Sequence, residues 1–185
     1  MQIIPLSEGS FTIDASKKFI PFDSSDDHLK DRSRGSLLVE IQPFAVITSK
    51  DILLLDTGLG FTGNDGILQI HHNLVQAGID PMDVTKVLMS HLHKDHAGGI
   101  SLEQPHIHHY HLSFPNAHYY VQRAELNFAF ETGLPSFVPK ELEILKTTDR
   151  LVILEGDGVL DGYIQYALSG GHSPFHQGFW IRERQ

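Results

Sequence analysis

Short apolar segments, separated by polar or glycine-containing turns, run through most of the chain. Leu, Val and Ile dominate residues 36–41 and 44–48, and residues 51–55 end in a continuous apolar run. Such segments are typical of β-strands, and a continuous apolar run suits a strand that is buried on both faces. We predict further strands at 85–90, 117–122, 151–155, 163–168 and 178–182.

Fewer segments show the periodicity of helices. Ile67, Ile70 and Leu74 recur at i, i+3 and i+7, and Gly78 follows them, which predicts an amphipathic helix that ends near this glycine. Residues 156–158, Gly-Asp-Gly, lie between two predicted strands and are expected to form a hairpin turn. Two further helices are predicted, at 123–131 and 140–146.

Strands therefore outnumber helices, and the helices fall between groups of strands. This order predicts a layered α/β domain with mixed sheets, and no repeat or linker divides the chain. A length of 185 residues, with 41% hydrophobic and 20% charged residues, is sufficient for one compact core. We therefore expect a single domain over residues 1–185.

Charge and composition disfavour several classes of function. The formal net charge of −9 argues against nucleic acid as a partner, because phosphate binding needs a basic surface. The absence of cysteine excludes disulfides and thiolate metal ligands. We find no signal peptide at the N-terminus and no apolar run of the roughly 20 residues that span a bilayer. We expect a cytoplasmic protein that acts on a small molecule and has no membrane partner.

Histidine is unusually frequent, with 13 of the 185 residues, and it is the commonest metal ligand in proteins. Four potential ligands fall within six residues: His91, His93, Asp95 and His96. On an extended segment His91 and His93 point the same way, so both rings can face one cation. A turn could aim Asp95 and His96 at a second cation. Residues 98–99, both glycine, would let the backbone turn tightly beneath the site.

Nitrogen and carboxylate ligands without thiolate favour zinc, followed by manganese, iron or cobalt. A catalytic metal of this kind lowers the pKa of a bound water toward about 7 and so supplies hydroxide at neutral pH. A second histidine-rich segment, residues 105–111, is interpreted as a polar surface loop. An accessory metal site or a substrate-gating loop is the alternative for that segment.

The segment His91–His96 resembles the signature of the metallo-β-lactamase fold superfamily. The resemblance covers about residues 35–182 and implies an αββα sandwich. Three further segments agree with the family in their order along the chain: residues 56–58 (Asp-Thr-Gly), residues 114–117, which precede a strand and Glu125 and are similar to the lactonase-like branch, and residues 171–176, which contain His172.

The resemblance implies roles for particular residues. Asp95 would have a catalytic role, because it would hydrogen-bond the attacking hydroxide. Asp56 and His176 would support the ligands without binding metal. Five residues would bind one or two zinc ions: His91, His93 and His172 the first, and Asp95 and His96 the second.

The later motif departs from the family pattern, because Gly170 and Phe175 stand where the family often has proline and glycine. The family also continues to a metal-bridging aspartate and a final histidine. No residue after His172 can take either part, and Asp157 and Asp161 precede it. We therefore expect that the C-terminal part of the fold lies outside these residues, or that the second metal position is incomplete.

The resemblance implies a zinc-dependent hydrolase in which a metal-bound hydroxide attacks the carbonyl of a lactone, an ester or a similar small substrate. A phosphotriester or phosphodiester hydrolase is one alternative. A non-catalytic metal-binding or interaction protein on the same fold is another, since a fold does not determine a function. Whether the protein forms a homo-oligomer is left open.

Overall fold

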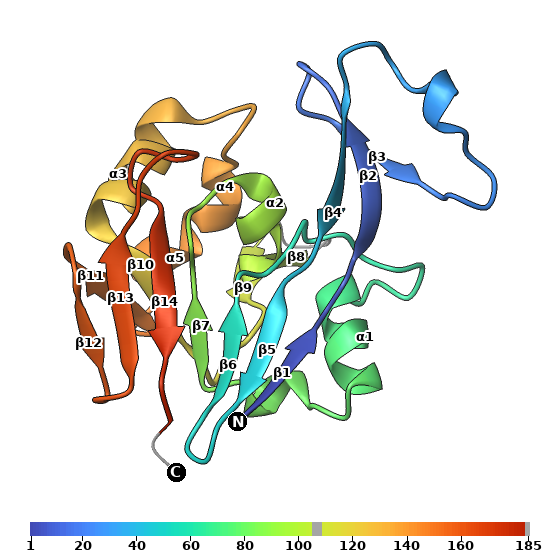
Figure 1. Cartoon of the computed structure of the whole chain (residues 1–185). Helices are drawn as coiled ribbons and strands as arrows, with labels where there is room; N and C mark the ends of the chain where they lie inside the picture. The colour runs from blue at the N-terminus through green and yellow to red at the C-terminus, as the bar shows by residue number, and fades with distance from the viewer. Residues whose placement is uncertain (105–108, 184–185) are drawn as a thin grey trace.

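A six-stranded mixed sheet forms the centre of the protein (Figure 1). The computed structural model of the chain describes residues 1–104 and 109–183. In spatial order the strands are β1 (Gln2–Pro5), β5 (Phe44–Ile47), β6 (Ile52–Leu55), β7 (Lys86–Leu88), β10 (His118–Gln122) and β11 (Leu151–Leu154). β5 pairs antiparallel with both β1 and β6, and the pairs from β6 to β11 are parallel.

Both faces of this sheet are buried. Leu54 and Val87 face one apolar core, whereas their neighbours Leu53 and Leu88 face another, as the alternation of side chains along a strand requires. The first core is covered by α1 (Gln69–Gln76), α3 (Arg123–Thr132), α4 (Pro139–Leu142) and α5 (Ile144–Thr147). The second is covered by an antiparallel sheet of β12 (Gly158–Leu160), β13 (Ile164–Leu168) and β14 (Gln177–Ile181).

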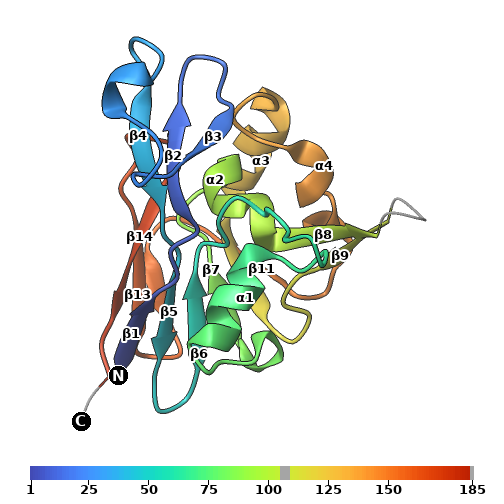
Figure 2. The same cartoon turned by 90° about the vertical axis from the view of Figure 1, so that its right-hand side faces the viewer.

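The described part of the chain is thus layered as helices, sheet and sheet (Figures 1 and 2). The layered α/β class with mixed sheets that the sequence predicts is confirmed. None of the helices in the described residues is long and apolar enough to cross a membrane.

A further antiparallel sheet projects beyond one end of the central sheet (Figure 1). Its strands are β3 (Phe19–Phe22), β2 (Gly9–Ile13) and β4 (Leu37–Ile41), with β2 in the middle. The chain passes from β1 into β2 and from β4 into β5, so this sheet continues the edge of the central one. It rises beside the ends of β6 and β7, where it forms one side of the candidate site.

The remaining elements are short. β8 (Ser101–Gln104) and β9 (His109–Leu112) form a two-stranded ribbon, so residues 109–111 of the histidine-rich segment lie in a strand and not in a loop. The other part of that segment, residues 105–108, lies outside the described residues. Three 3-10 helices span Leu29–Asp31, Pro81–Asp83 and Gly98–Ile100, and α2 spans Lys94–Ala97.

Two further local predictions differ from the structure. The single helix expected at 140–146 is a pair of short helices, α4 and α5. The hairpin turn expected at 156–158 is wrong, because β11 pairs in parallel with β10 in the central sheet, whereas β12 belongs to the second sheet and pairs with β13. The physical reason is burial: β11 has apolar side chains in both cores, so it needs cover on two faces.

Candidate metal centre

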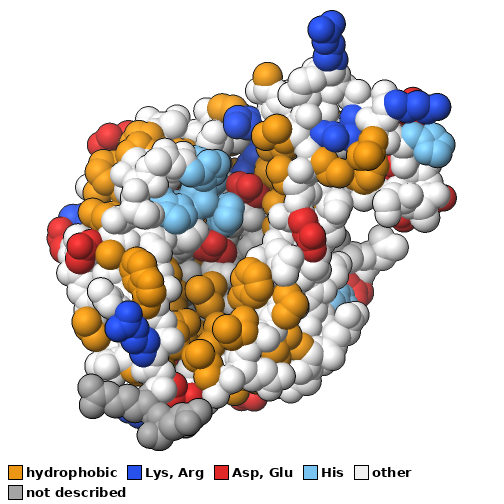
Figure 3. Space-filling model, in the orientation of Figure 1, with side chains coloured by type: hydrophobic (Ala, Val, Ile, Leu, Met, Phe, Trp, Pro, Cys, Tyr) orange, Lys and Arg blue, Asp and Glu red, His pale blue; other side chains and the backbone are white. Residues whose placement is uncertain are grey.

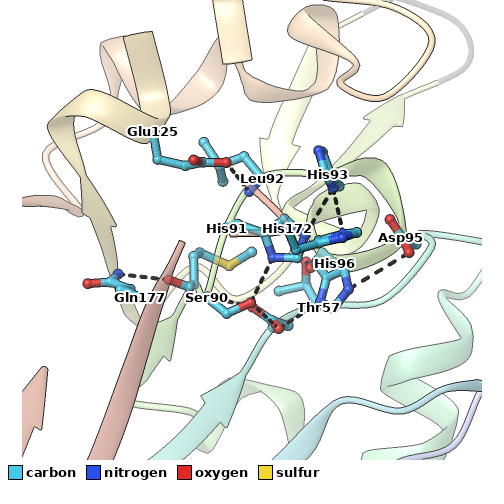
Figure 4. A network of polar contacts seen from close by, with 12 residues as sticks. Thr57, Ser90, His91, Leu92, His93, Asp95, His96, Glu125, His172 and Gln177 are labelled. Carbon is cyan, nitrogen blue, oxygen red and sulfur yellow. Dashed lines mark hydrogen bonds and ion pairs between the residues drawn. The ribbon is translucent and has the colours of Figure 1, made fainter. Parts of the chain in front are cut away.

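Three loops meet at the end of the central sheet where the parallel strands β6 and β7 finish (Figure 4). Asp56 follows β6 directly, and residues 90–96 follow β7 and contain the first residues of α2. The third loop joins β13 to β14 and carries His172. The backbone N–H of Gln177 donates to the carbonyl of Ser90 at 2.9 Å, which ties the start of β14 to the loop after β7.

His91, His93 and His172 face one another (Figure 4). Nε2 of His91 lies 3.1 Å from Nδ1 of His93, and that atom lies 3.0 Å from Nε2 of His172. One ring nitrogen of each residue lies within 4.8 Å of the other two, and the described residues contain no second group of three such ligands. Nitrogens bound to one tetrahedral zinc are roughly 3.3 Å apart, so this spacing suits a shared cation.

Asp56 orients the ring of His91 through Ser90. One oxygen of Asp56 accepts a hydrogen bond from the Ser90 backbone N–H, and the other accepts one from the Ser90 hydroxyl, both at 2.7 Å. Because the hydroxyl hydrogen is used, Ser90 Oγ accepts from Nδ1 of His91 at 3.0 Å. His91 therefore carries its proton on Nδ1, and its lone pair is on Nε2, the atom that faces His93.

Asp56 also orients His96, whose ring centroid lies 4.1 Å from that of His91. Nδ1 of His96 donates to Asp56 at 2.8 Å, which leaves Nε2 as the atom available to a metal. This Nε2 lies 3.8 Å from a carboxylate oxygen of Asp95. Asp95 and His96 thus form a pair beside the three histidines, but the described residues bring no third ligand to that pair.

The electrostatics keep His91 and His93 neutral. Burial, and then the charges of neighbouring histidines, lower the pKa of His91 to about 2. Burial and the nearby His172 lower the pKa of His93 to about 4. Burial would also lower the pKa of His96, but its hydrogen bond to Asp56 and the charges of Asp56 and Asp95 raise this pKa above the ordinary value. Neutral imidazoles present lone pairs at neutral pH, so the donor set fits a divalent metal.

Glu125 links two of the loops, whereas the resemblance placed it after a lactonase-like segment and implied no role for it. Its side chain projects from α3 and is 1% exposed. One oxygen accepts from the backbone N–H of Leu92 at 3.0 Å (Figure 4). The other accepts from the Ser173 hydroxyl at 2.6 Å. Leu92 separates His91 from His93, and Ser173 follows His172, so a single buried carboxylate positions all three histidines. The available sequence signal is an acidic residue on an otherwise apolar helix face.

Close backbone contact explains Gly98. The loop after β6 packs directly on this glycine, because the backbone N–H of Gly98 donates to the carbonyl of Gly58 at 2.9 Å. A Cβ atom at Gly98 would lie 2.2 Å from the carbonyl oxygen of Leu59. The sequence predicted a tight turn at residues 98–99, but the requirement for glycine arises from this approach of a second loop.

His176 lies beside the three histidines. Its ring centroid is 5.2 Å from that of His91, its Nδ1 lies 2.6 Å from Ser169 Oγ, and burial lowers its pKa. The two departures from the family pattern lie in the same loop. Phe175 packs edge-on against Phe128 at 5.9 Å between ring centroids, and Gly170 has a φ of +59°, which favours glycine.

A cavity of about 400 Å³ opens beside the three histidines. One side is formed by residues 93–95 together with His172. The opposite side is formed by apolar residues of the projecting sheet and the adjoining loops, including Ile13, Phe19, Leu37 and Val39. In the space-filling view a cluster of histidine side chains is visible at the surface, next to basic, acidic and hydrophobic side chains (Figure 3).

The fold and the histidine cluster define the class of protein as an α/β protein with two packed sheets and a group of three histidines that could hold a metal ion. Comparison with known proteins gives the family: the metallo-beta-lactamase superfamily model matches residues 39–184. The chain belongs to this superfamily.

The curated relatives of similar sequence include N-acyl homoserine lactonases. The chain is 34% identical over 116 residues to the N-acyl homoserine lactonase AttM of Azorhizobium caulinodans, covering 57% of this chain and 38% of that protein. It is 31% identical over 126 residues to the N-acyl homoserine lactonase AiiA of Bacillus thuringiensis subsp. kurstaki, covering 67% of this chain and 42% of that protein. The chain thus spans less than half the length of these relatives.

Solved structures share the fold. A probable metal-dependent hydrolase from Staphylococcus aureus aligns with a TM-score of 0.73 at 21% identity, over 99% of this chain and 69% of that one. AidC, a dizinc quorum-quenching lactonase solved with the product N-hexnoyl-L-homoserine, aligns with a TM-score of 0.72 at 23% identity, over 98% of this chain and 67% of that one. These likenesses confirm the fold expected from the sequence.

Proposed function

We propose that the protein is a zinc-dependent hydrolase that opens a lactone or cleaves a small ester. The observation that carries the proposal is the group of His91, His93 and His172 at a cavity, with the lone pair of His91 oriented by Asp56. The names of the lactonase relatives support a lactone as the first substrate class. Zinc is the favoured metal because the donors are imidazole and carboxylate without thiolate.

In this proposal the three histidines hold one cation, and Asp95 and His96 contribute to a second position. When bound, the cation supplies Lewis acidity, which lowers the pKa of water and stabilises negative charge on the carbonyl oxygen. Asp95 lines the cavity next to His93, where its carboxylate can accept a hydrogen bond from the attacking water and take up its proton. As the acyl C–O bond breaks, the same proton can pass to the leaving oxygen.

The test is hydrolysis by the zinc-loaded protein of N-hexanoyl homoserine lactone and ethyl hexanoate. We expect His93→Ala to lower kcat/KM and zinc affinity by more than about 100-fold, since even residues that only support ligands contribute about 10–100-fold. His109→Ala, which removes an exposed histidine of β9, is the matched control and should change neither. Lack of turnover by the zinc-loaded wild type on both substrates would refute the proposal.

A metal-binding protein without hydrolytic activity is the alternative, and one observation favours it. The described residues hold one complete group of three ligands and an incomplete pair, which is sufficient to bind a single structural cation. This alternative predicts that zinc raises Tm without turnover of any substrate. A phosphotriester added to the panel tests the other enzymatic alternative.

Several expectations from the sequence stay predictions. These are a small-molecule partner instead of nucleic acid or a membrane, a cytoplasmic location, and a single domain over residues 1–185. Size-exclusion chromatography with light scattering would establish the oligomeric state.

A further inference from the structure

Lys94 lies where the candidate metal centre meets the cavity. It stands between His93 and Asp95, and its backbone N–H donates to the carbonyl of Ser136 at 2.9 Å. Its ammonium nitrogen is 5.6 Å from the centre of the Phe19 ring, which belongs to the opposite side of the cavity. The charged end of Lys94 is therefore held between the two sides of the cavity.

This ammonium group forms no salt bridge in the described part of the chain, although its charge partly offsets the rise that burial causes in the pKa of Glu141. Within residues 1–104 and 109–183, no Asp or Glu oxygen lies within 4.0 Å of Lys94 Nζ. Asp14, an acidic residue that lines the cavity, already accepts hydrogen bonds from the Ser16 backbone N–H and hydroxyl, at 2.9 and 2.6 Å. Lys94 is half-buried and lines the cavity, so its ammonium group is open to an acceptor on a ligand or to water.

The rest of the cavity suits the hydrocarbon part of a ligand. Ile13, Leu37 and Val39 present apolar side chains on the side opposite the three histidines. Lys17, also at the cavity, adds a second positive charge. A ligand that fits these surroundings has an apolar chain and one anionic group, with its reactive carbonyl near the histidines.

We propose that Lys94 determines substrate specificity by binding a carboxylate on the substrate. The substrate class is then an acyl ester or lactone that also carries a carboxylate. This inference rests on the proposed hydrolase function for the reaction, whereas the binding of an anion at Lys94 can be tested without turnover.

The kinetic test compares monomethyl adipate, which carries a carboxylate, with the neutral dimethyl adipate. For the zinc-loaded Lys94→Met protein we expect kcat/KM for monomethyl adipate to fall about tenfold or more, the loss typical of a hydrogen bond to a charged group. The value for dimethyl adipate should stay within about twofold, and Lys94→Arg should retain the preference for the anion. Lys50→Met, which removes a lysine near Tyr163 and outside this cavity, is the matched control.

Equal losses on both esters would overturn the inference, because Lys94 would then act on the reaction or the fold and not on the charge. If the wild type cleaves neither ester, the proposed function loses support, and binding decides the inference. Hexanoate is then titrated into the zinc-loaded wild type, Lys94→Met and Lys50→Met proteins by calorimetry. An increase of about tenfold in Kd for Lys94→Met alone supports anion binding, and an unchanged Kd overturns it.

Discussion

Replacement of Glu125 should weaken metal binding, although this residue is not a ligand. Glu125→Ala removes the acceptor of two hydrogen bonds, those from the Leu92 N–H and the Ser173 hydroxyl. Both donors are on fully buried residues, so water cannot readily replace the carboxylate. The segments that carry His91, His93 and His172 would then be free to separate.

The expected loss of stability in Glu125→Ala follows from the two donors that lose their acceptor. A buried donor that loses its partner costs about 1–3 kcal/mol, so Glu125→Ala should lower the free energy of unfolding by about 2–6 kcal/mol. Zinc affinity should fall by about 10–100-fold, as for residues that orient ligands elsewhere. Glu125→Gln keeps the acceptor for Leu92 and can donate to Ser173 Oγ, so its cost should be only about 1 kcal/mol.

Urea unfolding of the zinc-free protein measures the stability, and competition with a fluorescent chelator measures the zinc affinity. The Gln variant keeps the test valid if the Ala variant does not fold, because it should fall between the wild type and Ala in both measurements. Glu131→Ala changes an exposed glutamate of the same helix and should alter neither quantity. A folded Glu125→Ala protein with wild-type zinc affinity would show that the carboxylate does not position the histidines.

Four further predictions concern the same site and its surroundings. Asp56→Asn should weaken zinc binding about 10–100-fold, because its single accepting oxygen cannot replace both the oxygen that accepts from the Ser90 N–H and the one that accepts from the Ser90 hydroxyl and His96; chelator competition with unchanged affinity would contradict this. Gly98→Ala should lower the free energy of unfolding by about 1–3 kcal/mol or more, measured in urea, since its Cβ would clash with the Leu59 carbonyl. Burial raises the pKa of Glu8 from 4.5 to about 7, so its protonated form favours folding. Its contribution, about 3 kcal/mol, is present below pH 4.5 and is lost as the pH rises through about 7, and Glu8→Gln should remove this part of the pH dependence of urea unfolding. Elemental analysis after dialysis should find about one tightly held zinc per chain, because the described residues offer one complete group of three ligands.

The arrangement of the histidines could be anticipated because it depends on spacing over a few residues. The alternation of side chains on an extended segment already places His91 and His93 on one side. His172 was expected through the order of motifs, since nothing in its own surroundings in the sequence indicates where its loop returns. The structure brings these three together, and their role as ligands remains a proposal.

Glu125 could not be found in the same way, because its partners lie 33 and 48 residues away in the sequence. Local patterns say nothing about such a separation. The helix face offers a partial signal: Glu125 is buried together with Leu126 and Ala129, so a charged residue occupies a position where apolar ones are expected. An acid at such a position needs partners, but the helix alone cannot show which ones they are.

The error at β11 has a similar origin. Residues 151–154 are a continuous apolar run, the same pattern that correctly indicated a doubly buried strand at 52–55. The glycines at 156 and 158 are typical of a local turn and by themselves predict a hairpin between the flanking strands. In the structure the requirement for cover on both faces determines the partner, and the glycines lie where the chain crosses between sheets.

The three histidines and part of the apolar side of the cavity come from different parts of the chain. The superfamily model begins at residue 39 and includes the three histidines, whereas Ile13, Phe19 and Leu37 of the cavity precede it. Within the segment His91–His96, Leu92 points into the core and Lys94 lines the cavity. The residues between the motif positions therefore contribute to packing and to the shape of the cavity. Family membership therefore supports the chemistry of the centre, but the substrate must be inferred from the cavity of this chain.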